Sequence, residues 1–118
     1  MFLDGALSDP LPIERAMKDG FEKFLIVFTR NSGYRKPQSK VSLFMKYRYR
    51  KYPNLLKLLE KRSETYNRQL ELIETLERQG KAKVLRPSQR LQVESITKDK
   101  KKLLNLYYLG YSDCKKIF

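Results

Sequence analysis

The chain is a strongly basic protein of 118 residues, with 26 Lys and Arg against 13 Asp and Glu and a formal net charge of +13. This length fits one domain, and 41% hydrophobic with 33% charged residues is typical of a folded protein. No apolar run approaches the ~20 residues of a membrane span, and the acidic start does not resemble a signal peptide, so we expect a cytoplasmic protein. One cysteine, Cys114, and no histidine exclude an internal disulfide and the commonest metal sites, so we expect no metal and no other cofactor.

The positive charge is concentrated in one part of the chain. Residues 23–59 carry ten basic residues and no acidic one, whereas residues 1–22 carry two basic and five acidic residues. A basic block of this kind predicts an anionic partner, such as phospholipid headgroups, nucleic acid or an acidic protein.

The first elements alternate between strand and helix. Residues 2–3 are typical of a strand end, and the following Asp4-Gly5 pair predicts a turn in which glycine takes a positive φ. A short helix is expected over residues 12–18. The apolar run "KFLIVFT", residues 23–29, predicts a strand covered on both faces, and the strand-helix-strand order favours a parallel pair.

A polar loop over residues 30–40 separates this unit from the helical part, which we expect to resume at Val41. The longest helix should run from Pro53 to Gly80, where the spacing predicts one apolar stripe formed by Leu55, Leu59, Tyr66, Leu70 and Ile73. On its outer face, we expect ion pairs of Glu64 with Arg68 and of Glu74 with Arg78, worth ~0.2–0.5 kcal/mol each.

The last third predicts a short strand within residues 81–87 and a further extended piece over residues 89–93. A C-terminal helix should start near Asp99, break at Gly110 and add a final turn over residues 112–116, with Cys114 partly buried on it. The predicted fold class is therefore α/β: a small, mainly parallel sheet with a long amphipathic helix and a C-terminal helix.

Complete hydrolytic sites are absent from the sequence. There is no G-x-S-x-G, no glycine-rich phosphate loop and no histidine for a Ser-His-Asp triad. Asp4 and Asp9 lie five residues apart across a turn, which sets no distance between two carboxylates. Asp4 occupies the strand-to-helix position where α/β enzymes place working residues. Spacing alone favours a turn acid that accepts a hydrogen bond from the backbone beyond it.

The run "LDGALSDPLPIERAMKDG" followed by "KFLIVFTRNSGYRKPQSK" resembles the catalytic-aspartate segment of bacterial patatin-like phospholipases, whose motif is D-G-G or D-G-A after a strand. The similarity continues through "RKYPNLLKLLEKRSETYNRQLELIETLERQGK", "VLRPSQ" and "LYYLGYSDCKK", so it covers nearly the whole chain. The resemblance implies that Asp4 is the base that takes a proton from a serine in G-x-S-x-G. Gly5 would allow the tight turn, and Ala6 is a tolerated alternative in the motif.

In that family the serine and the oxyanion loop lie upstream, without a counterpart here. We therefore expect the C-terminal portion of a patatin-like fold in a single domain, with residues 1–40 ending the catalytic core and residues 41–118 forming a helical and strand extension. The intact protein would hydrolyse acyl esters of phospholipids or related lipids, and this chain alone should be inactive. The missing strands would expose a sheet edge and favour a homo-oligomer.

The basic block has three interpretations. In "FMKYRYRKY", residues 44–52, tyrosines could cover the edge of the core while Lys and Arg stay solvated. The block could instead contact an anionic membrane or, in a non-enzymatic module, RNA, although no recognised nucleic-acid motif is present. The candidate contacts to an anionic surface are Arg35, Lys36, Lys46, Tyr47, Arg48, Tyr49, Arg50 and Lys51.

Overall fold

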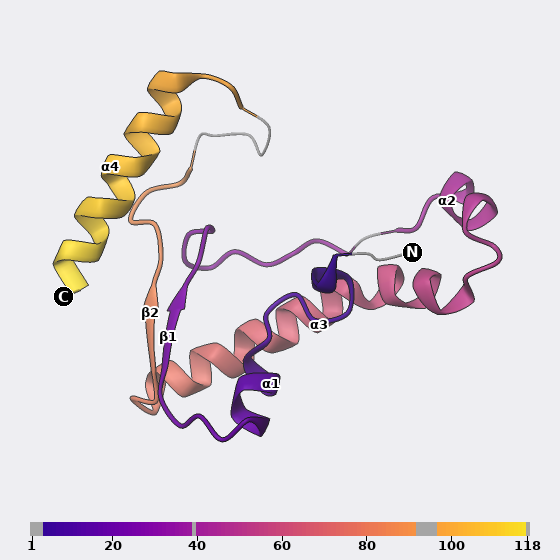
Figure 1. The fold of residues 1–118 in the computed structure, drawn as a ribbon, viewed down its shortest axis with the longest axis horizontal. Coiled ribbons are helices and arrows are strands. Elements are labelled where there is room, and N and C mark those ends of the chain that lie inside the picture. The colour runs from indigo at the N-terminus through magenta and orange to yellow at the C-terminus, as the bar shows by residue number, and fades with distance from the viewer. Residues whose placement is uncertain (1–3, 39, 92–96, 118) are drawn as a thin grey trace.

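The computed structural model describes residues 4–38, 40–91 and 97–117. Its elements, in chain order, are a 3-10 turn η1 (Gly5–Leu7), α1 (Ile13–Lys18), β1 (Phe24–Val27), α2 (Leu43–Arg48), α3 (Pro53–Arg78), β2 (Ala82–Leu85) and α4 (Lys100–Ile117) (Figure 1). The predicted α/β class, with a small parallel sheet, a long helix and a C-terminal helix, is confirmed. The strand end expected over residues 2–3 lies outside the described residues.

The two strands pair in parallel, with Phe24 opposite Ala82 and Val27 opposite Leu85. A parallel pair needs a crossover connection, which here contains α2 and α3. The sheet packs on the C-terminal half of α3, as the contact of α3 with β2 shows (Figure 1). The further extended piece expected over residues 89–93 forms no strand at residues 89–91, and its remainder lies outside the described residues.

One face of β1 is open, so the expectation that both faces are covered was wrong. Exposure alternates along the strand, and Leu25 and Val27 are 59% and 64% exposed. An apolar run predicts a strand, but a strand that is covered on only one face can have the same apolar composition. The described residues therefore leave an apolar sheet face in solvent.

The core lies along α3, which begins with Pro53 at its first turn, a position where the missing N–H costs nothing. Its buried apolar residues Leu70, Ile73 and Leu76 recur every three residues in the second half of the helix. The rest of the core is Ile13, Phe28, Ala82 and Val84. The predicted stripe is correct for Leu70 and Ile73, whereas Leu55 and Leu59 are only half-buried.

The predicted ion pairs within α3 were wrong. Arg68 lies 3.5 Å from Glu14 of α1, and Glu74 binds Arg35 of the preceding loop at 2.9 Å. Arg78 donates to the Thr75 hydroxyl instead. Arg68 and Glu74 thus connect α3 to other segments, whereas Arg78 bonds within the helix.

The C-terminal helix α4 runs through Gly110 without the predicted break. Glycine inside a helix costs only ~1 kcal/mol relative to alanine, and the flanking helix-forming residues offset that cost. As predicted, Asp99 caps the helix by accepting from the Lys101 N–H at 3.0 Å, and Cys114 is half-buried on it. Across the described ranges, no helix combines the length and apolarity needed to cross a membrane.

Candidate functional site

Asp4 caps the turn η1. Its Oδ1 accepts a hydrogen bond from the Ala6 N–H at 2.9 Å, and its carbonyl accepts from the Leu7 N–H at 3.1 Å. The Gly5 carbonyl accepts from the backbone N–H groups of Ser8 and Asp9 at 3.0 Å. Asp4 therefore lies exposed at the start of a short helical turn, with one carboxylate oxygen held by the backbone.

Gly5 does not take the positive φ that was expected from the Asp4-Gly5 turn. Within the described ranges, positive φ values occur at Gly20, Gly33 and Gly80, at 91°, 76° and 71°. Gly5 is the first residue of η1, and a Cβ there would meet nothing within 4 Å. The turn expectation was wrong in this detail because a 3-10 turn reverses the chain with ordinary helical dihedrals.

The segment that follows the Asp4 turn is tied to α3 by Gln69, a residue that the sequence reasoning missed. Gln69 is 2% exposed; its Nε2 donates to Asp9 Oδ1 at 2.6 Å and its Oε1 accepts from the Leu11 N–H at 3.0 Å. The Asp9 carboxylate thus bonds to Gln69, and the Asp4 carboxylate bonds to the Ala6 N–H. These hydrogen bonds do not join Asp4 and Asp9 into an acid–base pair. A polar residue on the apolar stripe, three residues after Tyr66 and four before Ile73, was the available signal.

Arg35 and Lys36 hold the loop after β1 against α3. The Arg35 guanidinium binds both carboxylate oxygens of Glu74, at 2.9 and 3.1 Å. The backbone of Lys36 exchanges two hydrogen bonds with the Asn67 side chain, at 2.8 and 3.0 Å. The Arg35 side chain and the Lys36 backbone therefore have partners within the fold, and the contact of these two residues with an anionic surface stays a prediction.

The Lys36 ammonium lies 5.5 Å from the centre of the Tyr66 ring. Burial and the nearby Arg62 guanidinium lower the pKa of Lys36, and burial raises the pKa of Tyr66. These opposite shifts describe a partly dry contact in which a cation is packed on an aromatic face. The Lys36 side chain therefore packs against α3 within the fold.

The basic residues of α2 and of residues 49–51 lie near Glu60 or near tyrosines of the same segment, or are exposed. Lys46 forms an exposed ion pair with Glu60 at 3.4 Å. The Arg50 guanidinium lies 4.6 Å from the Tyr47 ring centre, and that of Arg48 lies 5.9 Å from the Tyr49 ring centre. Lys51 is exposed.

The aromatic residues of this segment do not cover the core. Phe44 and Tyr47 are 75% and 69% exposed, and Tyr52 is 55% exposed, while Tyr49 is half-buried. The interpretation in which tyrosines seal the core edge was wrong, because α2 lies at the end of α3 farthest from the sheet (Figure 1).

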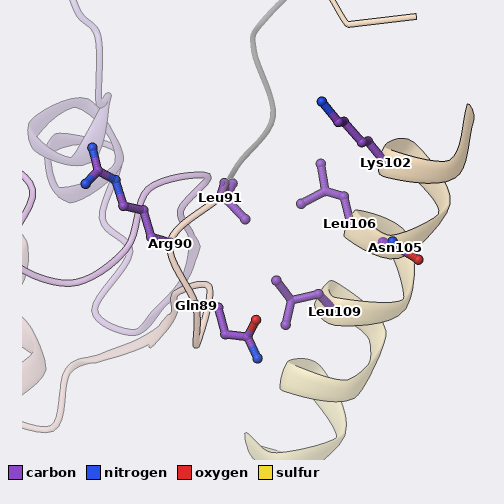
Figure 2. A pocket seen from close by; sticks show the side chains of 7 residues that line it. All are labelled: Gln89, Arg90, Leu91, Lys102, Asn105, Leu106 and Leu109. Carbon is purple, nitrogen blue, oxygen red and sulfur yellow. The ribbon is translucent and has the colours of Figure 1, made fainter. Parts of the chain in front are cut away.

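Two grooves border the sheet and the C-terminal helix. One, of about 410 Å³, follows the free edge of β1 and is lined by Leu11, Ile13, Ala16, Phe21 and Leu25 among others. The second, of about 470 Å³, separates residues 89–91 from α4, with Leu91 facing Leu106 and Leu109 and with Lys102 near the rim (Figure 2). Neither groove is lined by the predicted site residues.

No cluster of three or more potential metal ligands occurs in the part of the chain that the structure describes. A family model matches residues 52–118, and its description is a domain of unknown function (DUF6363). The chain belongs to this family. Neither a curated protein nor a solved structure matches the chain.

The DUF6363 region begins at the residue that precedes α3 and includes α3, β2 and α4. Its only described strand, β2, pairs with β1, which lies outside the match. The Asp4 turn and the basic residues from Arg35 to Lys51 also precede the DUF6363 region. The candidate site residues therefore precede the DUF6363 region, in the segment whose strand β1 pairs with β2 of that region.

Proposed function

We propose that this chain supplies the general-base aspartate of a patatin-like acyl hydrolase, which in the intact protein cleaves acyl esters of phospholipids or related lipids. The proposal rests on the resemblance of Asp4, Gly5 and Ala6 to the D-G-A motif. The observation that carries it is the exposed carboxylate of Asp4, oriented at a chain turn by the Ala6 N–H.

This geometry suits a base in acyl transfer. The Ala6 N–H engages Oδ1, which fixes the carboxylate and leaves Oδ2 to accept the proton of an attacking serine. As the serine oxygen bonds to the ester carbonyl carbon, its proton passes to the carboxylate. The same proton then passes to the leaving alcohol oxygen as the bond between that oxygen and the carbonyl carbon breaks. Water then attacks the acyl-serine and gives a proton to the carboxylate, which passes it to the serine oxygen as the fatty acid leaves.

The hydrogen bonds of Gln69 favour a fixed position for this base. A buried side chain of the longest helix holds Asp9 and Leu11, so the segment that follows Asp4 is tied to the core. Positioning of this kind is a large part of what a general base contributes. The serine must come from outside this chain, which has no G-x-S-x-G, and the chain alone is expected to be inactive.

Hydrolysis of a short-chain p-nitrophenyl ester tests the proposal. The chain is compared with a version extended upstream to include the expected serine segment, each beside its Asp4→Asn variant. Asp99→Asn is a matched control because Asp99 also accepts a backbone hydrogen bond with Oδ1, at the start of α4. Activity confined to the extended protein, lost in Asp4→Asn and kept in Asp99→Asn, supports the proposal; activity that is unchanged in Asp4→Asn contradicts it.

A further inference from the structure

The most exposed large apolar side chains of the described residues gather on α2. Leu43 is 86% exposed, Phe44 75% and Tyr47 69%. They occupy positions i, i+1 and i+4 of the helix, so they share one side of it. We call these three residues, together with Arg48 and Arg50, the α2 surface. It lies at the end of α3 remote from the sheet (Figure 1).

The α2 surface lies on a capped turn of helix that an exposed ion pair connects to α3. Ser42 caps the helix by accepting from the Met45 N–H at 3.2 Å, and Lys46 pairs with Glu60 of α3 at 3.4 Å. The Arg50 guanidinium lies over the Tyr47 ring. The exposed leucine and phenylalanine are therefore presented on a defined turn of helix.

The charge around this surface is mainly positive, although Glu60 of α3 pairs with Lys46 of α2. Residues 23–59 contain ten basic residues and no acidic residue, and Arg48, Arg50 and Lys51 are all exposed. A partner must therefore combine negative charge with an apolar phase that accepts leucine and phenylalanine. A bilayer containing anionic phospholipid offers both, whereas single-stranded nucleic acid offers stacking to aromatic rings but nothing for Leu43.

We propose that the α2 surface docks on an anionic phospholipid membrane. Leu43 and Phe44 enter the boundary between headgroups and acyl chains, Tyr47 lies at headgroup level, and Arg48 and Arg50 pair with lipid phosphates. The proposal depends on the α2 surface alone. Its failure would leave the assignment of Asp4 untouched, and the reverse also holds.

Cosedimentation of the full chain with lipid vesicles tests this proposal. Vesicles of phosphatidylcholine containing about one third phosphatidylserine are compared with pure phosphatidylcholine vesicles. We expect at least tenfold tighter binding to the anionic vesicles, reduced by added salt. The replacement Arg48→Gln with Arg50→Gln should weaken binding roughly 25-fold, at about fivefold per charge.

The replacement Leu43→Ser with Phe44→Ser should weaken binding by about tenfold or more, because two large side chains lose their apolar environment. Two matched controls lie on α4: Leu103→Ser with Leu104→Ser, at residues that are 44% and 54% exposed, and Lys100→Gln with Lys101→Gln. Both controls should bind as the unaltered chain does. Far-UV circular dichroism and urea midpoints establish that each variant is folded.

Insertion is measured separately with an environment-sensitive fluorophore in a Cys114→Ser background. A label at Phe44→Cys should shift to the blue on anionic vesicles, and one at Leu104→Cys should not. Equal losses in the α2 and α4 variants would overturn the proposal, as would equal binding to both vesicle types. Tight binding to a single-stranded oligonucleotide with no binding to vesicles would overturn it in favour of nucleic acid.

Discussion

The side-chain amide of Gln69 donates a 2.6 Å hydrogen bond to the carboxylate of Asp9, a residue 60 positions earlier in the chain. The same amide accepts a hydrogen bond from the Leu11 N–H. One buried side chain thereby connects the middle of α3 to the segment that follows Asp4. Gln69 consequently ties the segment after the candidate base to the core.

Gln69→Leu should lower the free energy of unfolding by about 1–3 kcal/mol, because the partly buried Asp9 carboxylate and Leu11 N–H lose their partner. Urea unfolding followed by circular dichroism measures this loss. Gln79→Leu is the control, since Gln79 is exposed at the end of the same helix. Equal stability of the two variants would show that the buried amide does not hold the turn.

Ile73→Ala should lower the free energy of unfolding by about 2–5 kcal/mol, because Ile73 is 1% exposed at the centre of the core. Leu58→Ala on the same helix should cost much less, since Leu58 is 41% exposed. The comparison of urea midpoints checks both values. Similar losses would place the core elsewhere along α3.

Asp113 should make stability depend on acid pH. The Ser88 backbone N–H at 2.8 Å, the Ser88 hydroxyl and Lys116 together hold the pKa of this carboxyl below its usual value of 3.8, although burial opposes them. A carboxyl with a depressed folded-state pKa adds stability that is present above its unfolded pKa and is lost as the pH falls through the folded pKa.

The stability advantage of the unaltered chain over Asp113→Asn should therefore be complete near neutral pH and shrink once the pH drops below about 4. Urea midpoints from pH 6 downward measure this difference, with Asp99→Asn as the control on the same helix. An advantage that stays constant down to the acid limit would exclude the Asp113 charge as its source.

The open face of β1 should make the chain self-associate. Leu25 and Val27 form an exposed apolar face that a second copy can cover, and the second edge of the same strand has no partner among the described residues. Leu25→Thr with Val27→Thr places β-branched residues, which strands favour, at both positions and removes the exposed apolar side chains, so it should shift the population toward monomer in sedimentation velocity. A chain that is monomeric at all concentrations would refute this expectation.

The sequence was most informative where the signal was local. The apolar run at residues 24–27, Pro53 at the first turn of α3 and the Asp99 cap each specify an element through nearby physics. The continuation of α4 through Gly110 was missed because a glycine lowers helix stability without forbidding it.

What could not be predicted depends on distant partners. The pairing of Arg35 with Glu74 joins residues 39 positions apart, and no local spacing distinguishes that partner from Arg78. Whether one or both faces of β1 are covered is likewise decided by other segments. The role of Gln69 was partly predictable. Its place on the apolar stripe could be seen in the sequence, but its hydrogen bond to Asp9 could not.

The most direct test of the central claim is fatty acid release from phospholipid vesicles by the upstream-extended protein, compared with its Asp4→Asn and Asp99→Asn variants. Loss of a general base reduces the rate by about 10²–10⁴-fold. We expect a loss of this size in Asp4→Asn, with unchanged serine labelling by a fluorophosphonate under forcing conditions. The rate of Asp99→Asn should lie within about twofold of the rate of the parent. Equal rates in the parent and Asp4→Asn would contradict the assignment of Asp4 as the base.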